Sequence, residues 1–345
     1  MSSVDLREPR ARVDRSGQQG QARQVEAPRG LRQRRALGPL VVAMSLLMIA
    51  WLGDDALHRV DAVPRMEDVP SSTAPGLSIR TLPLERNPSV ERWMEQLQTT
   101  RREEFQALLE SSGVFEDLIR SKLRERSMPE ELLYLAMIES GLSPLAESRV
   151  AAVGLWQFMD PTARDLGLRM DEYVDERRDP VRATDAALDY LFWLRARFGS
   201  WYLAVAAYNA GYSRIERILE LYADGRTGDE AIYWEILRHL PRETREYVPR
   251  LIATALLAAD AEALGFAQSD ARAYEYDSVY VPGGTKLTVV ARSLDVHADV
   301  LRDLNPHLIR DVTPPGEMYA LRVPAGHGPA VVASLGRAWP APNVD

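Results

Sequence analysis

The sequence predicts a mainly helical domain, a small α+β module after it and a membrane-spanning helix before it. Helix start and stop residues recur between residues 89 and 270, where strand patterns are almost absent. Between residues 274 and 326, two segments of alternating β-favouring residues enclose two short helical segments. A run of 18 uncharged residues precedes both regions. The chain has 345 residues, 46% of them hydrophobic, which suffices for one sizeable core and a smaller one.

Residues 1–35 form a basic arm with nine arginines and four acidic residues. Because the whole chain carries a net charge of −8, the remaining residues carry −13. A nucleic acid could attract such an arm. Its position beside an apolar run makes membrane topology and anionic lipid the simpler explanation, and we predict no nucleic-acid partner.

The apolar run, residues 36–53, is at the short end of a membrane span. A cleavable signal peptide is the alternative, but its core is usually shorter and ends at small residues. This run ends in Trp51, Leu52, Gly53 and two aspartates, which is typical of a span that meets water. We therefore predict an uncleaved anchor with the arm in the cytoplasm. Residues 54–88, with five prolines, predict a tether.

The helical domain is expected to begin near residue 89. Ser127 to Glu130 fits a capping box that opens a helix, and Gly141 fits the end of that helix. Asp179 and Pro180 fit the cap and first position of another, which stops at Gly199. The other predicted helices span residues 89–111, 114–126, 200–211, 213–222 and 242–264.

Glu139 is the most informative residue of the chain. On a helix, Leu132, Leu135 and Glu139 share one face, so the carboxyl group lies in an apolar stripe. Poor solvation disfavours the charged form and raises the pKa. A glutamic acid that stays protonated near neutral pH is suited to protonating a glycosidic oxygen. Taken alone, a glutamate at a helix end is more often a solvated surface residue.

Several other chemistries find no support in the sequence. There are no cysteines, which excludes disulfides, thiolate metal sites and cysteine nucleophiles. The five histidines show no metal-ligand spacing, and phosphate-binding loops and the serine-hydrolase elbow are missing. We therefore expect neither a metal nor a cofactor.

Four short motifs occur in order along the helical region: ES at 139–140, GLWQFM at 154–159, AAYNAG at 206–211 and PRETREYV at 241–248. Together they resemble the soluble-type lytic murein transglycosylases, most closely the membrane-bound D type. The resemblance covers about residues 118–265. It implies a lysozyme-like fold for residues 89–270, peptidoglycan as the substrate, and a place on the periplasmic face of a bacterial inner membrane.

The resemblance also implies roles for residues. It makes Glu139 the sole catalytic acid and base, and it places Ser148 near the reacting sugar. A solvated loop serine is the alternative for Ser148. Gln157 and Met159 match positions that line the cleft. Ala151 stands where many relatives have glycine, which affects the backbone of this loop because only glycine readily adopts a positive φ.

By the same resemblance, Tyr208 and Asn209 face Glu139 across the cleft. Tyr208 alone would be read as a core tyrosine. Glu243 and Tyr247 lie one helical turn apart and either close the far side or form a surface pair. We expect Trp156 to pack in the core rather than stack on a sugar. The same expectation holds for Trp193, Phe198 and Trp201.

The expected mechanism follows the family. Glycoside hydrolysis commonly uses two carboxylates, but no acidic residue lies between Glu147 and Asp160. One glutamate would then serve twice, first as acid and then as base toward the C6 hydroxyl of the sugar, which leaves a 1,6-anhydro end. A lysozyme-like hydrolase and an inactive cell-wall scaffold remain as alternatives.

Residues 274–326 resemble a LysM glycan-binding module in their β-α-α-β order. The sequence departs from the usual Gly-Asp-Thr at Gly283, Gly284 and Thr285. Glycan binding and packing against the catalytic domain are therefore both open for this module. Residues 327–345 are expected to form a flexible tail.

Overall fold

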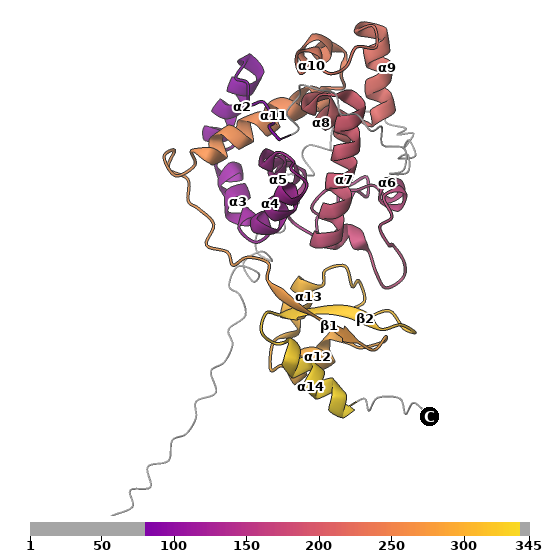
Figure 1. Ribbon diagram of the computed structural model, residues 1–345. Helices are drawn as coiled ribbons and strands as arrows, with labels where there is room; N and C mark the ends of the chain where they lie inside the picture. Colours follow the sequence, from indigo (N-terminus) through magenta and orange to yellow (C-terminus); the bar gives the residue numbers. More distant parts are fainter. Residues whose placement is uncertain (1–79, 339–345) are drawn as a thin grey trace, which may run out of the picture.

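The computed structural model describes residues 80–338 (Figure 1). The predicted basic arm, membrane span and most of the predicted tether lie outside the described residues. Within residues 80–338, every helix is too short or too polar to cross a membrane. The described chain forms a helical domain and a smaller module that packs beneath it in the view of Figure 1.

The first helices are α2 (Pro88–Gln98), α3 (Arg102–Ser112) and α4 (Glu116–Glu125). Asn87 caps α2 by accepting from the backbone N–H groups of Ser89 and Val90. Our prediction of one helix over residues 89–111 is wrong, because the chain leaves the helical conformation at Thr99. The Thr99 hydroxyl donates to the Glu95 carbonyl at 2.7 Å, a side-chain bond that competes with helix continuation.

The helix that carries Glu139 is α5 (Leu133–Ser140), entered through a 3₁₀ turn (Glu130–Leu132). The predicted capping box is wrong. Ser127 has φ +54° and belongs to the turn that ends α4, and Pro129 occupies the cap position of the 3₁₀ turn without a side-chain bond. The predicted stop is confirmed: Gly141 has φ +60° and its N–H donates to the Met137 carbonyl.

The remaining helices of this domain are α6 (Asp160–Asp165), α7 (Pro180–Phe198), α8 (Trp201–Ala210), α9 (Tyr212–Tyr222), α10 (Ala231–Ile236) and α11 (Arg242–Ala259), with 3₁₀ turns at Glu176–Arg178 and Leu237–His239. The predicted cap Asp179 is confirmed, since it accepts from two amides of α7. Ser200 caps α8 by accepting from the Leu203 N–H. The helix predicted to reach residue 264 ends at Ala259 and continues as turns.

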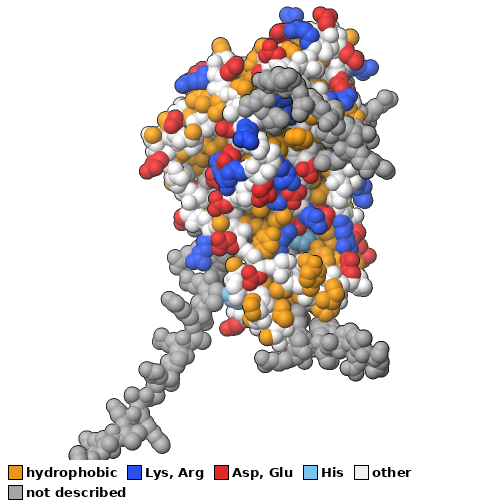
Figure 2. Space-filling model, viewed as in Figure 1, with side chains coloured by type: hydrophobic (Ala, Val, Ile, Leu, Met, Phe, Trp, Pro, Cys, Tyr) orange, Lys and Arg blue, Asp and Glu red, His pale blue; other side chains and the backbone are white. Residues whose placement is uncertain are grey.

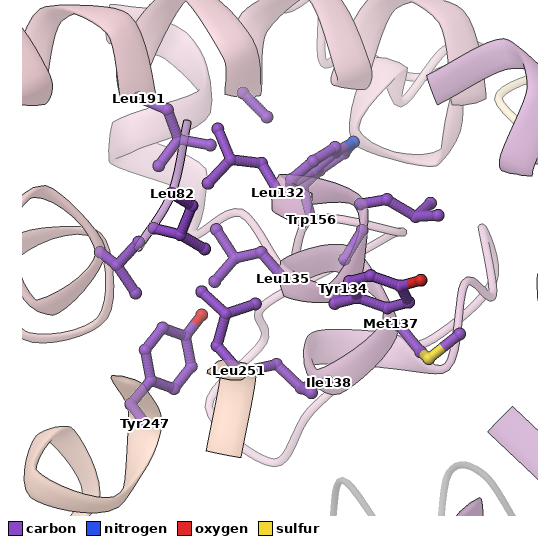
Figure 3. Packing of buried hydrophobic residues seen from close by; sticks show 14 of the residues in the cluster. Leu82, Leu132, Tyr134, Leu135, Met137, Ile138, Trp156, Leu191, Tyr247 and Leu251 are labelled. Carbon is purple, nitrogen blue, oxygen red and sulfur yellow. The ribbon is translucent and has the colours of Figure 1, made fainter. Parts of the chain in front are cut away.

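Helix α5 lies inside the domain, and α11 packs along it (Figure 3). Leu132 and Leu135 have no exposed surface, and Tyr247 and Leu251 of α11 lie beside them. Each such side chain contributes about 1.5–3 kcal/mol on burial, so the position of α5 is strongly fixed. Core packing of the predicted aromatic residues is confirmed for Trp156, Trp193, Phe198 and Trp201.

The C-terminal module has the predicted β-α-α-β order. Strands β1 (Tyr276–Val281) and β2 (Tyr319–Pro324) pair antiparallel, with α12 (Leu287–Ser293) and α13 (Ala298–Leu304) between them. The predicted flexible tail is wrong for residues 328–338, which form α14 (Gly328–Ala338). Val331 is fully buried and the Asp277 carboxylate accepts from the Gly328 N–H at 2.9 Å, so both packing and a helix-end bond hold α14 in place.

Basic and acidic side chains are interspersed over the face shown in Figure 2. Charged side chains of the helical domain form ion pairs, as in Arg126 with Asp185 at 2.8 Å and Arg197 with Glu216. This face therefore presents no extended patch of one charge.

Candidate active site

Glu139 is half-buried, whereas every other residue of α5 is buried. Its neighbours Ile138 and Ser140 are both buried, so the side chain leaves a tightly packed helix end. The Ser140 hydroxyl donates to the Leu155 carbonyl at 2.8 Å, which ties this end of α5 to the loop that follows. The local sequence thus places one carboxyl group at the edge of an apolar core.

The environment of Glu139 raises its pKa from 4.5 to about 7. Burial among apolar groups is the largest cause. The hydrogen bond from Tyr247 and the positive charge of Arg250 lower the pKa, whereas the negative charge of Glu243 raises it. A carboxyl group with this pKa exchanges its proton readily at neutral pH, so it is suited to act as an acid and then as a base.

Helix α11 supplies the groups that control Glu139. The hydroxyl group of Tyr247 donates to Oε1 of Glu139. Burial raises the pKa of Tyr247 well above its usual value, so this hydroxyl keeps its proton. One turn earlier, Oε1 of Glu243 accepts from the side-chain amide of Asn209 at 3.0 Å. The Thr244 hydroxyl donates to the other end of the same amide at 2.7 Å, so α11 holds Asn209 from two sides.

The loop of residues 146–158 follows α5 and contains two of the predicted polar residues. Ser148 is buried, and its hydroxyl oxygen accepts from the Ala152 N–H at 2.9 Å. The side-chain amide of Gln157 donates to the Gly154 carbonyl at 2.8 Å. Ala151 and Gln157 adopt φ +61° and +49°, which costs about 1 kcal/mol or more for residues other than glycine. The polar side chains therefore hold a strained loop in shape.

Tyr208 connects this loop to α8. Its hydroxyl donates to the Trp156 carbonyl at 2.8 Å, and its ring lies against those of Phe158 and Tyr190. Burial raises the pKa of Tyr208 well above its usual value, and the charge of Glu139 adds to the effect. Tyr208 is therefore a neutral hydroxyl donor close enough to Glu139 to respond to its charge.

The structure thus groups Tyr208, Glu243 and Tyr247 around Glu139 through contact or charge, with Asn209 bound to Glu243. The side-chain bonds of Ser148 and Gln157 go to the backbone of the loop instead. Met159 is half-buried and stands at the cap position of α6.

Sequence reasoning missed Arg250. This arginine is almost fully buried one turn after Tyr247, with Nη2 3.4 Å from a carboxylate oxygen of Glu104. Its guanidinium group also lies 5.5 Å from the ring centre of Trp93. The available signal was an arginine at the start of the apolar run RLIATALLAA, because a buried charge is costly unless it is paired.

A second carboxylate acts on Glu139 from outside the 146–158 loop. The 146–158 loop has a single acid, Glu147, which is exposed and pairs with Arg178 at 3.0 Å. Glu243 approaches Glu139 from α11 instead, about a hundred residues further along the chain. Of the two positions that the sequence left open for Glu243, the one beside Glu139 agrees with the structure. Within residues 80–338, no three His, Asp or Glu side chains gather as metal ligands would.

Comparison with known proteins agrees with this geometry. Residues 117–228 match the family model of the transglycosylase SLT domain, which includes Glu139, the 146–158 loop and Tyr208. We call the helical domain that contains this matched stretch the SLT domain. Residues 275–338 match the family model of the LysM-like domain of lytic transglycosylase MltD, and we call them the LysM-like module.

Three curated relatives are each similar to a part of this chain. Membrane-bound lytic murein transglycosylase D of Escherichia coli K12 is 39% identical over 137 residues, which are 39% of this chain and 29% of that protein. A putative tributyltin chloride resistance protein of Alteromonas is 35% identical over 102 residues, 29% of this chain and 49% of that one. Peptidoglycan transglycosylase gp16 of phage T7 is 35% identical over 124 residues, 35% of this chain and 8% of that one. The similarity thus spans less than half of each relative.

Proposed function

We propose that this protein is a lytic transglycosylase that cleaves the β-1,4 bond between MurNAc and GlcNAc in peptidoglycan. The observation that carries the proposal is the environment of Glu139. Glu139 is the single residue of α5 that is half-buried rather than buried. The pKa of its carboxyl group is raised to about 7, and Tyr247 donates a hydrogen bond to it. The match to the SLT domain and the names of the E. coli and phage relatives support the same substrate.

In the first step, protonated Glu139 donates its proton to the bridging oxygen. The bond between this oxygen and C1 of MurNAc breaks, and the leaving sugar departs as an alcohol. The N-acetyl carbonyl oxygen of MurNAc bonds to C1 and carries the positive charge. General acid catalysis of this kind contributes about 10²–10⁴-fold to the rate, and a pKa of about 7 keeps much of Glu139 protonated at neutral pH.

In the second step, the carboxylate of Glu139 takes the proton of the C6 hydroxyl group. The freed O6 attacks C1, the bond between C1 and the acetyl oxygen breaks, and a 1,6-anhydro-MurNAc end results. Glu139 is protonated again and no water is consumed. The hydrogen bond from Tyr247 stabilises the carboxylate between the two steps.

The other predicted residues take supporting roles in this proposal. Ser148 and Gln157 keep the 146–158 loop in shape beside Glu139, and the free oxygen of the Gln157 amide is available to a sugar hydroxyl. Met159 supplies an apolar wall. Tyr208 and Asn209 orient the N-acetyl group from the side of α8, where both are half-buried.

A second function is favoured by one observation, the presence of Glu243. A carboxylate near Glu139 is what a hydrolase uses to activate water, so a lysozyme-like muramidase is the runner-up. However, Oε1 of Glu243 is already bound to Asn209, which favours a positioning role. An inactive peptidoglycan-binding scaffold would need neither the raised pKa nor the donor from Tyr247.

We also propose that residues 36–53 anchor the protein in the bacterial inner membrane, with the SLT domain in the periplasm. The support is the charge pattern around this run and the membrane-bound name of the E. coli relative. Cell fractionation followed by protease treatment of spheroplasts tests the topology. Degradation of the SLT domain with protection of the N-terminal arm is expected, and protection of both would contradict it.

The activity is tested by incubating purified peptidoglycan with the full chain and, separately, with Glu139→Gln. Mass spectrometry should find anhydro-ended muropeptides with the native protein and none with the variant. Products with reducing ends would establish the hydrolase instead. Equal activity of the two proteins would overturn the role of Glu139.

A further inference from the structure

The LysM-like module contacts the SLT domain through residues 171–179, which we call the bridging segment. The Asp175 N–H donates to the His307 carbonyl at 2.9 Å, and the Ile309 N–H donates to the Tyr173 carbonyl at 3.0 Å. Val174 pairs with Leu308 as an isolated antiparallel bridge and is fully buried in the core of the LysM-like module. The module is therefore bound along the backbone of the bridging segment.

A buried ion pair stabilises the contact between the two domains at the end of the bridging segment. Nη2 of Arg322, on β2, lies 2.8 Å from both carboxylate oxygens of Asp179. Asp179 is 3% exposed, and it also caps α7 through the amides of Val181 and Arg182. Burial lowers the pKa of His307, beside Asp179, to about 4, so this imidazole is neutral at physiological pH. Arg322 thus supplies the positive charge that balances Asp179 across the two domains.

Arg322 is itself held firmly within the module. Its backbone N–H and carbonyl both bond to the side-chain amide of Asn305, at 3.0 and 2.7 Å. Its Nη1 donates to the hydroxyl oxygen of Tyr274 at 3.2 Å. These bonds hold the guanidinium group of Arg322 in one orientation toward Asp179, unlike a mobile charge on the protein surface.

The bridging segment also contacts the 146–158 loop, which follows the helix of Glu139. A Cβ atom at Gly154, which has φ +85°, would lie 1.8 Å from the Arg177 carbonyl oxygen. Arg177 donates to the Ala151 carbonyl at 3.3 Å, and Arg178 pairs with Glu147 at 3.0 Å. The bridging segment therefore lies between the LysM-like module and the strained 146–158 loop.

We propose that Arg322 and Asp179 are positioning residues for glycan cleavage. By locking the LysM-like module onto the bridging segment, they keep the 146–158 loop in the conformation that serves Glu139. The module thereby contributes to turnover even on a glycan too short to reach its own surface. This inference rests on the proposed transglycosylase function.

The test compares variants of the full chain on a short, peptide-free glycan of alternating MurNAc and GlcNAc. Asp179→Asn keeps an oxygen that caps α7 but removes the charge. Arg322→Lys keeps the charge but loses the guanidinium group that contacts Asp179 and Tyr274 at the same time. Glu317→Gln is the control, because Glu317 forms an exposed pair with Arg169 between the same two domains. Thermal unfolding confirms that each variant is folded.

We expect Asp179→Asn to lower kcat by about tenfold with little change in KM, since small displacements of catalytic geometry have effects of this size. The kcat of Arg322→Lys should lie between those of Asp179→Asn and the native protein, and the kcat of Glu317→Gln should be close to native. Amide hydrogen exchange within residues 146–158 should be faster in Asp179→Asn than in Glu317→Gln.

Native kcat and native exchange in Asp179→Asn would overturn the inference. A defect confined to KM on whole peptidoglycan would also overturn it, because the module would then act as a glycan binder. Absence of anhydro products from the native protein would refute the proposed function instead, and the exchange comparison would still decide whether the two domains are coupled.

Discussion

The hydroxyl group of Tyr247 donates a hydrogen bond to Oε1 of Glu139, although 108 residues separate the two along the chain. This bond opposes the burial that raises the pKa of Glu139. Helix α11 therefore governs the protonation of a carboxyl group on α5. Glu243 on the same helix raises the pKa of Glu139, so α11 carries two side chains with opposite effects on this pKa.

Tyr247→Phe removes the bond that lowers the pKa of Glu139. We expect the pKa to rise above its native value of about 7, so that protonated Glu139 persists to higher pH. The alkaline limb of the kcat/KM profile should move upward in pH. The maximal rate should fall by roughly 10-fold or more, because the carboxylate formed in the first step loses its donor. An alkaline limb that stays at the native pH would show that Tyr247 does not control Glu139.

Glu243→Gln should move the alkaline limb the other way. The substitution removes a negative charge that raises the pKa of Glu139, and it keeps the oxygen that accepts from Asn209. We expect the alkaline limb to lie at lower pH than in the native protein, and we expect substantial activity to remain. Complete loss of activity at every pH would instead point to Glu243 as the base of a hydrolase.

Glu139→Gln should make the protein more stable at alkaline pH. The folded-state pKa of about 7 exceeds the ordinary 4.5, so the native state binds more protons than the unfolded state between these values. Stability attributable to Glu139 is thus present below about pH 4.5 and is lost as pH rises through about 7. Because Glu139 keeps some contact with solvent, we expect a gain of about 2 kcal/mol for the variant near pH 8 and almost none near pH 4.5.

Urea unfolding of both proteins at the two pH values measures this difference. A gain that is the same at both values would contradict a raised pKa, since a glutamine alters packing equally at any pH.

Gly154→Ala tests the packing of the 146–158 loop on the bridging segment. The added Cβ atom would collide with the Arg177 carbonyl, so we expect a loss of about 3 kcal/mol or more together with most of the activity. Gly167→Ala is the matched control, because Gly167 also has a positive φ but has open space where the Cβ atom would lie. It should cost only about 1 kcal/mol and leave the activity intact. Equal melting temperatures for the two variants would contradict the close approach at Gly154.

Short-range signals predicted much of this structure. Asp179 with Pro180, Ser200, and the glycines at 141 and 199 set helix ends where the structure has them. Each signal works because cap side chains and left-handed glycines satisfy backbone groups within a few residues. The raised pKa expected for Glu139 from its apolar helix face also agrees with the structure.

Interactions between distant residues were not predictable in this way. The approach of Glu243 to Glu139 depends on how α11 packs against α5, and no local pattern encodes it. The pairing of Asp179 with Arg322 joins residues 143 positions apart. The role of Asp179 as a helix cap already explains an aspartate at this position, so the sequence pattern does not indicate a second partner.

Cleavage in water enriched in ¹⁸O distinguishes a transglycosylase from a hydrolase. A transglycosylase closes the new ring with O6 of its own substrate, so we expect anhydro products that carry no ¹⁸O from the solvent. Incorporation of one ¹⁸O atom at C1 of the released MurNAc end would mean that water is the nucleophile, and it would contradict the proposed role of Glu139 as acid and then base toward the sugar.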